Sequence, residues 1–532
     1  MLETNNFLYR RLSRRRFLHT LLLAGSAAAI DWRTFERMAE AAGPGQDHPV
    51  VVIGAGLGGL VAAAYLCKHG FPVTVIEMNA VPGGYASCFE REDFVFDVSL
   101  HATVAEHGMP QMILSELGIW EQLDVVYTPE LCRIITSRED VTLPAKDPEG
   151  VKQALVNVFP HEKRGIHGFY AQMEQVIDEL WSGQSGRGAM MANLEKLSLE
   201  EWMRMHVTDP ELKHCMAIFC GYYGLCPERL NALFYAIATG EYLVHGGQYY
   251  KTRSRDLSRA LARAIRENGG RIMFNTQVEE ICFSGKQGRI TGVKDTGNNI
   301  HPASAVIANC SVPSLFSSLI PEQQVASSYR KKLNRYAPSY SSVIVWLGLN
   351  RPLDQVSNYG IDISLDNDKS ILNGQTDPAR SGIGVTIYDN LFQGYSPPGK
   401  STLSIMTLSD YGHWQPFEED YFKNQKTAYY KEKERIAGCF INKVQKKLIP
   451  GLKDMIEVME VGTPLTNIYY TGNSKGAIYG FNRDEPQLEV RTPVKGLYLA
   501  SAWSHGGGYT PVMMAGREAA TALLGDIGDK SI

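Results

Sequence analysis

Short runs of consecutive apolar residues, separated by a glycine-rich turn and a helical pattern, mark the start of the globular part of the chain. Residues 49–53 form an apolar run rich in β-branched residues, and residues 73–76 form a second. Such runs are typical of strands buried on both faces of a parallel sheet. Residues 60–69 between them have an alanine-rich helical pattern that ends at Gly70, a natural helix stop. The pattern therefore predicts a strand, a helix and a second strand.

The turn between the first strand and the helix, residues 54–59, reads GAGLGG. Three of its glycines match the spacing G-x-G-x-x-G, which allows a tight turn, close approach of the backbone to a pyrophosphate and close packing of the helix on the strand. The helix N-terminus directs partial positive charge at the phosphates. We expect the cofactor-binding residues of this turn to be Gly54, Gly56, Gly58 and Gly59.

The second strand ends in Glu77, 23 residues after Gly54. An acidic residue at this distance is placed to accept hydrogen bonds from an adenosine ribose. With strand, glycines, helix, strand and acid in register, the sequence predicts a Rossmann dinucleotide-binding unit. The unit alone does not distinguish FAD from NAD.

The N-terminus has the order of regions found in a signal peptide. Residues 10–16 contain five arginines in seven positions, an apolar run covers 17–30, and residues 39–41 read AEA. Residues 13–18, SRRRFL, resemble the twin-arginine motif, whose pathway carries folded proteins. We expect a twin-arginine signal over residues 1–41, export by the Tat machinery and a periplasmic or other extracytoplasmic location with peripheral membrane contact. An uncleaved anchor and an amphipathic first helix are the alternatives.

Composition adds mainly exclusions. The 53 basic and 57 acidic residues give a net charge of −4 over 532 residues, so no single-sign field favours nucleic acid as a partner. Nine cysteines without a C-x-x-C pair predict neither a disulfide framework nor a metal site. Cys215, Cys220 and Cys226 are close enough in sequence for one disulfide, with buried thiols as the alternative.

Two segments after the dinucleotide unit resemble FAD enzymes related to phytoene desaturase, carotenoid isomerase and retinol saturase. Residues 82–89 read PGGYASCF, and residues 94–101 read FVFDVSLH. In these relatives a Gly-Gly precedes a hairpin that carries F-D-x-x-x-H. The resemblance implies an FAD cofactor. The protein backbone at Gly83, Gly84 and Tyr85 would lie against this cofactor, and side chains at the two glycines would collide with it.

The C-terminal part extends the resemblance. Residues 496–508 read as a strand that enters a glycine-rich turn before a helical pattern, like the closing FAD motif of the group, and residues 463–480 resemble its substrate-side segment. Residues 275–281 read as the strand that returns to the adenine side. The cofactor contacts implied here are Val278, Ser501, Gly507, Gly508 and Tyr509.

The resemblance implies an α/β fold with a Rossmann-like FAD-binding domain of the glutathione reductase type and an interleaved α+β substrate domain. We expect the FAD-binding domain over 46–125, 245–314 and 455–528, and the substrate domain over 126–244 and 315–454. The substrate domain contains aromatic-rich helical patterns, such as residues 219–223 and 233–242, and a strand pattern at 340–347. These elements either form core or line an apolar tunnel.

The implied activity is an FAD-dependent oxidoreduction that adds or removes hydride at C–C bonds of an isoprenoid, polyene or other small apolar substrate, by desaturation, saturation or isomerisation. The candidates for proton transfer are His101 first, Tyr479 second and His505 third. The alternatives are an amine or amino-acid oxidase and a flavin electron-transfer protein without turnover. Tyr85, where amine oxidases usually have arginine, and the absence of a Glu after Ala500 disfavour the oxidase.

Two further expectations concern charge and electrons. Residues 251–256 read KTRSRD, and their three basic side chains either contact the cofactor phosphates or an acidic substrate group, or belong to a solvated helix entry capped by Asp256.

The sequence has no second glycine-rich strand-turn-helix unit for NAD(P)H. We therefore expect a quinone, a cytochrome or oxygen as the electron partner.

Overall fold

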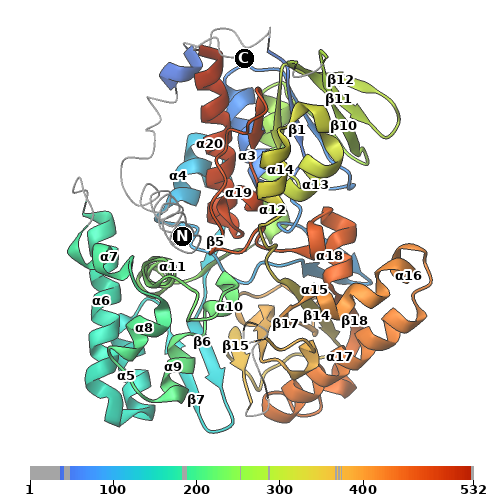
Figure 1. Cartoon of the computed structure of the whole chain (residues 1–532). Coiled ribbons are helices and arrows are strands. Elements are labelled where there is room, and N and C mark those ends of the chain that lie inside the picture. Colours follow the sequence, from blue (N-terminus) through green and yellow to red (C-terminus); the bar gives the residue numbers. More distant parts are fainter. Residues whose placement is uncertain are drawn as a thin grey trace.

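The computed structural model describes residues 36–40, 48–182, 188–251, 253–285, 288–365, 368, 372 and 374–528. These form three lobes: an upper lobe around a parallel sheet, a helical lobe at lower left and a sheet-based lobe at lower right (Figure 1). The predicted leader, residues 1–41, lies outside the described residues except for 36–40.

The upper lobe contains the predicted dinucleotide-binding unit. Its five parallel strands lie in the order β19-β13-β1-β2-β9. They are β1 (Val50–Ile53), β2 (Val73–Ile76), β9 (Arg271–Met273), β13 (Ala305–Ala308) and β19 (Leu497–Leu499). All four residues of β1 are buried, which confirms the prediction of a strand covered on both faces.

Successive residues of β1 enter two different cores. Val50 and Val52 pack with the helices α3 (Leu57–Lys68), α12 (Ser254–Glu267) and α20 (Tyr509–Gly528). Val51 and Ile53 pack on the other face with an antiparallel sheet. That sheet consists of β10 (Val278–Phe283), β11 (Ile290–Asp295) and β12 (Ile300–Pro302). Helix α4 (Met109–Glu116) also packs in the first of these cores.

The lower right lobe is built on a seven-stranded sheet in the order β18-β14-β17-β16-β15-β6-β7. Its strands are β6 (Glu130–Ile135), β7 (Asp140–Pro144), β14 (Ser341–Leu349), β15 (Gly360–Ile363), β16 (Ile383–Ile387), β17 (Ser401–Ser409) and β18 (Ile456–Gly462). Val343, Val345 and Leu347 face a core with helix α17 (Thr427–Lys447). Ile344 and Trp346 face the opposite side, where the hairpin of β3 (Cys88–Arg91) and β4 (Phe94–Asp97) packs.

Short helices complete this lobe and its junction with the upper lobe. They are α15 (Tyr411–Trp414), α16 (Glu418–Phe422), α18 (Pro464–Thr471) and α19 (Ala502–His505). A two-stranded pair of β5 (Val125–Tyr127) and β8 (Gln248–Tyr250) joins the upper lobe to the helical lobe.

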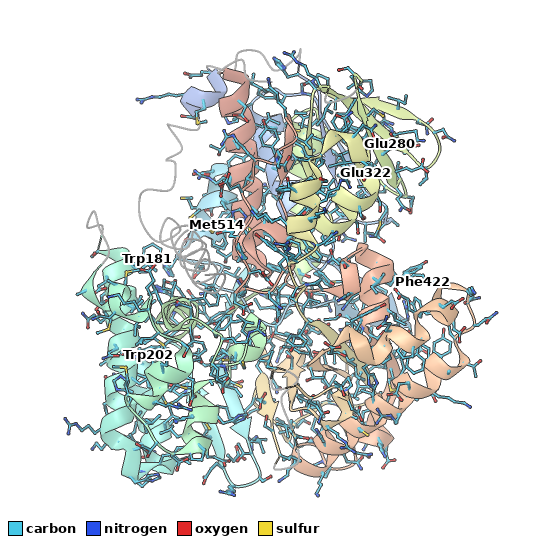
Figure 2. The ribbon with its side chains drawn as sticks, viewed as in Figure 1. Trp181, Trp202, Glu280, Glu322, Phe422 and Met514 are labelled. Carbon is cyan, nitrogen blue, oxygen red and sulfur yellow. The ribbon has the colours of Figure 1, made fainter. Side chains whose placement is uncertain are left out.

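The helical lobe has one aromatic-rich core. Trp202 lies inside it and Trp181 lies at its edge (Figure 2). Its helices are α5 (Pro148–Val158), α6 (Lys163–Trp181), α7 (Ala189–Leu194), α8 (Leu199–Arg204), α9 (Pro210–Met216), α10 (Cys220–Tyr223) and α11 (Ala232–His245). Cys215, Cys220 and Cys226 are free thiols here, and the alternative of buried thiols holds for Cys215 and Cys220, whereas Cys226 is half-buried.

Three expected element positions differ from the structure. Strand β18, expected with the upper lobe, pairs with β14 because its backbone completes the edge of the seven-stranded sheet. Residues 315–336, expected in the substrate domain, include α14 (Ser327–Leu333) and pack in the core that holds Val51. Glu322 accordingly lies in the upper lobe, as does Glu280 (Figure 2). Residues 278–281 belong to β10, whereas β9 is the strand that joins the parallel sheet.

Among the described helices, none combines the length and the apolar character needed to cross a membrane.

Candidate functional site

A large cavity lies where the three lobes meet, with a volume of about 1780 Å³. Drug-sized ligands occupy pockets of about 300–1,000 Å³, so this cavity has room for a cofactor and a substrate together. One part is lined by the glycine-rich segments that contain Gly54, Gly83 and Gly507. The other part is lined by aromatic and aliphatic side chains, among them Phe219, Tyr222, Phe234, Trp346 and Met406.

The two N-terminal glycine segments contact one another at the cavity wall. Gly83 donates its N–H to the carbonyl of Ala55 at 2.7 Å. Gly54, Gly56, Gly58, Gly83 and Gly84 all line the cavity. Gly84 has φ +58°, and a Cβ atom there would meet no other described atom within 4 Å except Gly56 Cα at 3.6 Å. The backbone thus leaves open space where a cofactor would lie.

Gly58 and Gly59 have packing roles. A Cβ atom on Gly58 would lie 2.0 Å from the carbonyl oxygen of Ala500, and one on Gly59 would lie 2.2 Å from that of Gly54. Gly58 still lines the cavity, but Gly59 does not. Gly59 allows the helix to pack closely on the strand. Its position therefore does not support the expected contact with the cofactor.

Glu77 lies at the end of β2 on the cavity wall and is buried. Its Oε2 accepts from Ala55 N at 2.7 Å, and its Oε1 accepts from Asn79 N and Asn79 Nδ2, both at 2.8 Å. A carboxylate has about four acceptor positions, so it can accept one more hydrogen bond. Glu77 therefore both holds the glycine turn and can bind a ribose hydroxyl.

Two buried tyrosine hydroxyls have room for a ligand acceptor. Tyr85 and Tyr509 line the cavity, and their hydroxyl oxygens make no hydrogen bond of normal geometry among the described residues, although Thr471 and Asn473 interact with Tyr85 and Ser254 interacts with Tyr509. Burial raises the pKa of Tyr85 to about 12, so its hydroxyl is a donor at neutral pH. Buried polar groups are normally hydrogen-bonded, and a cofactor rich in acceptor atoms would satisfy both. The remaining predicted contacts also line the cavity, namely Val278, Ser501, Gly507 and Gly508.

The three basic residues Lys251, Arg253 and Arg255 do not line the cavity. Lys251 pairs with Asp124, and Arg255 pairs with Glu90. The guanidinium of Arg253 lies over the ring of Tyr395 at 4.2 Å. The first of the two interpretations, contact with phosphates or substrate, is therefore wrong.

Helix α12 is capped from another element, not by Asp256. The buried carboxylate of Asp97 accepts from Ser254 N at 3.0 Å and from Ser254 Oγ at 2.7 Å. It also accepts from Tyr249 Oη at 2.8 Å. The Asp97 of the F-D-x-x-x-H pattern thus connects the β3–β4 hairpin to this helix.

His101 lies on the cavity wall, between the β3–β4 hairpin and the seven-stranded sheet. Its Nδ1 lies 3.0 Å from Thr386 Oγ1 and its Nε2 lies 3.3 Å from Met406 Sδ. Thioether sulfur only accepts hydrogen bonds, which assigns the proton to Nε2 and makes the Thr386 hydroxyl the donor to Nδ1. Burial lowers the pKa of His101 to about 4, so the ring is neutral at neutral pH.

The other two candidates for proton transfer line the cavity but are engaged elsewhere. Tyr479 donates its hydroxyl to the carbonyl of Gly221 at 3.0 Å. His505 is buried, with Nε2 at 2.9 Å from Glu518 Oε2 and Nδ1 at 3.1 Å from Ser504 Oγ. These contacts position helices α10 and α20. His101 also has a partner at each ring nitrogen, but its Nε2 faces a thioether, which is a weak acceptor, so it is the best placed of the three.

Several charged residues on the cavity wall were missed by the sequence reasoning, among them Glu241 and Arg483. Glu241 lies on α11, where its Oε1 accepts from Trp181 Nε1 at 2.9 Å and burial raises its pKa to about 7. Arg483 lies in the segment between α18 and β19. Neither belongs to a motif, and only the folded chain brings them to the cavity.

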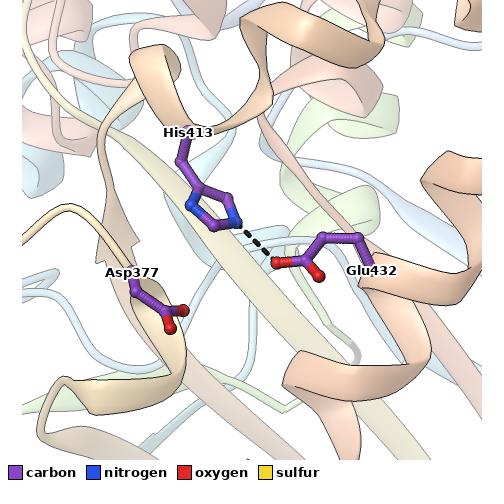
Figure 3. A group of neighbouring side chains, drawn as sticks. All are labelled: Asp377, His413 and Glu432. Atoms are coloured by element: carbon purple, nitrogen blue, oxygen red, sulfur yellow. Dashed lines mark hydrogen bonds and ion pairs between the residues drawn. The ribbon is translucent and has the colours of Figure 1, made fainter.

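A separate group of potential metal ligands, Asp377, His413 and Glu432, lies outside the cavity wall (Figure 3). His413 Nε2 is 2.7 Å from Glu432 Oε1. Arg435 Nη2 is 2.7 Å from both Asp377 Oδ1 and Glu432 Oε1. One guanidinium already pairs with both carboxylates, so the group is an ion-pair cluster.

Comparison with known proteins adds family information. The model of the family described as flavin-containing amine oxidoreductase matches residues 57–524. Prolycopene isomerase of Daucus carota is 26% identical, over 98% of this chain and 87% of that protein. All-trans-retinol 13,14-reductase of Danio rerio is 23% identical, over 85% of this chain and 82% of that protein. The 4,4'-diapolycopene oxygenase of Methylomonas is 24% identical, over 87% and 94%.

Solved structures share the fold. An oxidoreductase from Methanosarcina mazei superposes with a TM-score of 0.61 at 17% identity, over 88% of this chain and 99% of that one. A triple mutant of putrescine oxidase superposes with a TM-score of 0.61 at 16% identity, over 91% and 99%. These likenesses confirm the α/β fold with a parallel sheet.

Proposed function

This chain belongs to the family of flavin-containing amine oxidoreductases, and from that premise we propose that it is an FAD-dependent enzyme that adds or removes hydride at C–C bonds of an isoprenoid or polyene. The observation that carries the proposal is the continuity of the cavity, which joins the glycine segments to a chamber of aromatic and aliphatic side chains. Relatives named for lycopene, retinol and diapolycopene match most of the chain.

The residues that would hold FAD are those that line the first part of the cavity. Glu77 would bind the ribose. The turns at Gly54–Gly56 and Gly83–Gly84 would lie against the dinucleotide, and Gly507–Gly508 would lie beside the flavin ring. Bound FAD supplies a two-electron acceptor or donor. The protein contributes orientation and exclusion of water.

His101 is the proposed proton-transfer residue. Thr386 fixes the ring through Nδ1, so that Nε2 carries the proton on the cavity side, next to Met406. A neutral imidazole can pass this proton to a substrate carbon only as Nδ1 takes up the Thr386 hydroxyl proton, and the hydroxyl would then regain a proton from solvent, so His101 would act as a proton relay. The neighbouring chamber residues, such as Tyr222 and Phe219, would hold the apolar chain.

The test is anaerobic flavin spectroscopy of the purified holoprotein. A panel of polyenes and a panel of primary amines are each added to the oxidised and to the photoreduced enzyme. The proposal requires that polyenes bleach the oxidised flavin or restore the colour of the reduced flavin. Rapid bleaching by amines alone would establish the alternative of an amine oxidase, and a flavin that responds only to a redox partner would establish electron transfer without turnover.

We also propose that the protein is exported by the Tat machinery to an extracytoplasmic location, with peripheral membrane contact. The support is the SRRRFL sequence at residues 13–18 and the need to insert a bulky cofactor before export. Replacement of Arg14 and Arg15 by lysine should leave the flavoprotein in the cytoplasmic fraction. Unchanged fractionation of this variant would refute the export proposal.

We further infer that a quinone or a cytochrome is the electron partner, on the ground that an exported enzyme meets little NAD(P)H. The reduced enzyme should be reoxidised by a soluble quinone within the time of turnover. Fast stoichiometric reduction of its flavin by NADPH would contradict this inference.

A further inference from the structure

Arg483 is a half-buried cation on the cavity wall with no counter-ion in salt-bridge contact among the described residues. Its Nη2 donates to the carbonyl of Gly507 at 2.8 Å. Its Nε and Nη1 are buried and have no hydrogen-bond partner among the described residues. Arg483 also lines the cavity. An arginine with two unsatisfied N–H nitrogens at a ligand cavity needs an explanation, because buried polar groups are normally paired.

The acidic residues next in sequence are committed elsewhere. Asp484 pairs with Arg229 at 2.6 Å, and Glu485 Oε1 accepts from Ala337 N at 3.1 Å. The side chains against the guanidinium are aromatic, with its carbon 4.8 Å from the ring centre of Phe234 and 5.9 Å from that of Tyr479. Burial lowers the pKa of Arg483.

Arginine nevertheless stays protonated in proteins, so an uncompensated positive charge remains at this place. Such a charge is costly inside a protein unless an anion pairs with it. An anionic ligand in the cavity would supply the missing partner.

The local backbone is adapted to the guanidinium. Gly506 has φ +86°, and a Cβ atom there would lie 2.7 Å from Arg483 Nη1. Only glycine lets the loop before α20 approach so closely. With the loop on one side and Phe234 and Tyr479 beside it, the planar fork is held in one orientation, which suits a planar anion with two oxygens.

We propose that Arg483 forms a carboxylate-recognition subsite and that the substrate is an amphiphile, an apolar unsaturated chain that ends in a carboxylate. The aromatic chamber would hold the chain, and Arg483 would pair with the carboxylate near the Gly506–Gly508 loop. The proposal rests on the proposed function only in taking this cavity as the substrate site.

The test measures equilibrium binding, which needs no turnover. The oxidised holoenzyme is titrated with retinoic acid and with retinol, and separately with a long-chain fatty acid and its alcohol, with the flavin spectrum or ligand fluorescence as readout. The variants are Arg483→Gln and Arg483→Lys. Arg229→Gln is the matched control, because Arg229 has its own counter-ion in Asp484.

The wild type should bind each acid more tightly than its alcohol. Arg483→Gln should weaken acid binding by about 10- to 100-fold, the range of hydrogen bonds to charged groups, and change alcohol binding less than about threefold. Arg483→Lys should recover part of the preference, and Arg229→Gln should keep it.

An acid-to-alcohol affinity ratio that is the same in wild type and Arg483→Gln would overturn the subsite. If Arg483→Gln keeps this ratio but has a lower flavin midpoint potential, the carboxylate subsite is also overturned. That result would show that the Arg483 charge acts on the flavin. If the fatty-acid pair shows the preference while neither retinoid binds, the subsite stands and the polyene proposal fails. Flavin content and thermal midpoint confirm that each variant is folded.

Discussion

Replacement of Glu241 by glutamine should stabilise the protein at alkaline pH. Burial raises the pKa of Glu241 from 4.5 to about 7, so the folded state favours the protonated carboxyl. The side chain is 16% exposed, and His245 Nε2 lies 3.8 Å from its Oε2. Burial also lowers the pKa of His245, so this histidine is neutral where Glu241 ionises and gives it little compensation.

The two pKa values give the sign and size of the effect of Glu241 on the free energy of unfolding. Below pH 4.5 the carboxyl is protonated in both states and carries no cost. The cost grows between pH 4.5 and 7 and is complete above pH 7, where it reaches about 3 kcal/mol at 1.36 kcal/mol per pH unit. Glutamine keeps an oxygen to accept from Trp181 Nε1 and cannot ionise.

The assay is urea unfolding of the flavin-loaded protein, followed by tryptophan fluorescence, at pH 5 and pH 8. Glu241→Gln should exceed the wild type by less than about 1 kcal/mol at pH 5 and by about 3 kcal/mol at pH 8. Glu267→Gln, at an exposed position of α12, is the control and should show no such trend. A difference that does not change with pH, or a variant less stable than the wild type at pH 8, would refute the reasoning.

Three further outcomes are expected. Gly58→Ala should cost about 1–3 kcal/mol and lower the flavin content, because its Cβ would lie 2.0 Å from a backbone oxygen, whereas Gly438→Ala, which meets no described atom within 4 Å, should cost nothing in the same thermal assay. Asp97→Asn should cost about 2–3 kcal/mol in urea unfolding, because the amide nitrogen faces donors such as Ser254 N and Oγ; equal stability would show that the cap is dispensable. His101→Gln should slow turnover by about 100-fold or more with flavin content unchanged, and full turnover would remove His101 from the mechanism.

The sequence predicts the dinucleotide unit well because its determinants are local. The apolar run of β1, the glycine turn and Glu77 at the end of β2 occur within 28 residues, from Val50 to Glu77. Each element has its own pattern, and the folded chain places the turn and Glu77 on one cavity wall. The glycines that pack against distant backbone, such as Gly58 against Ala500, have the same local signature.

The features that depend on distant segments were not predictable in this way. The edge strand β18 is assigned by its pairing with β14, more than a hundred residues earlier in the chain. The cap of α12 comes from Asp97, 157 residues away. Arg483 and Glu241 belong to no sequence motif. Only the folded chain places both residues on the wall of one cavity.

The most direct test of the central claim is the anaerobic response of the bound flavin to a polyene. Purified holoenzyme, photoreduced and free of oxygen, is mixed with a polyene, and both the flavin spectrum and the polyene product are followed. The account predicts reoxidation of the flavin, or substrate-driven bleaching of the oxidised form, together with a change in the number or geometry of the polyene double bonds. A flavin that ignores every polyene and is bleached by a primary amine would contradict it.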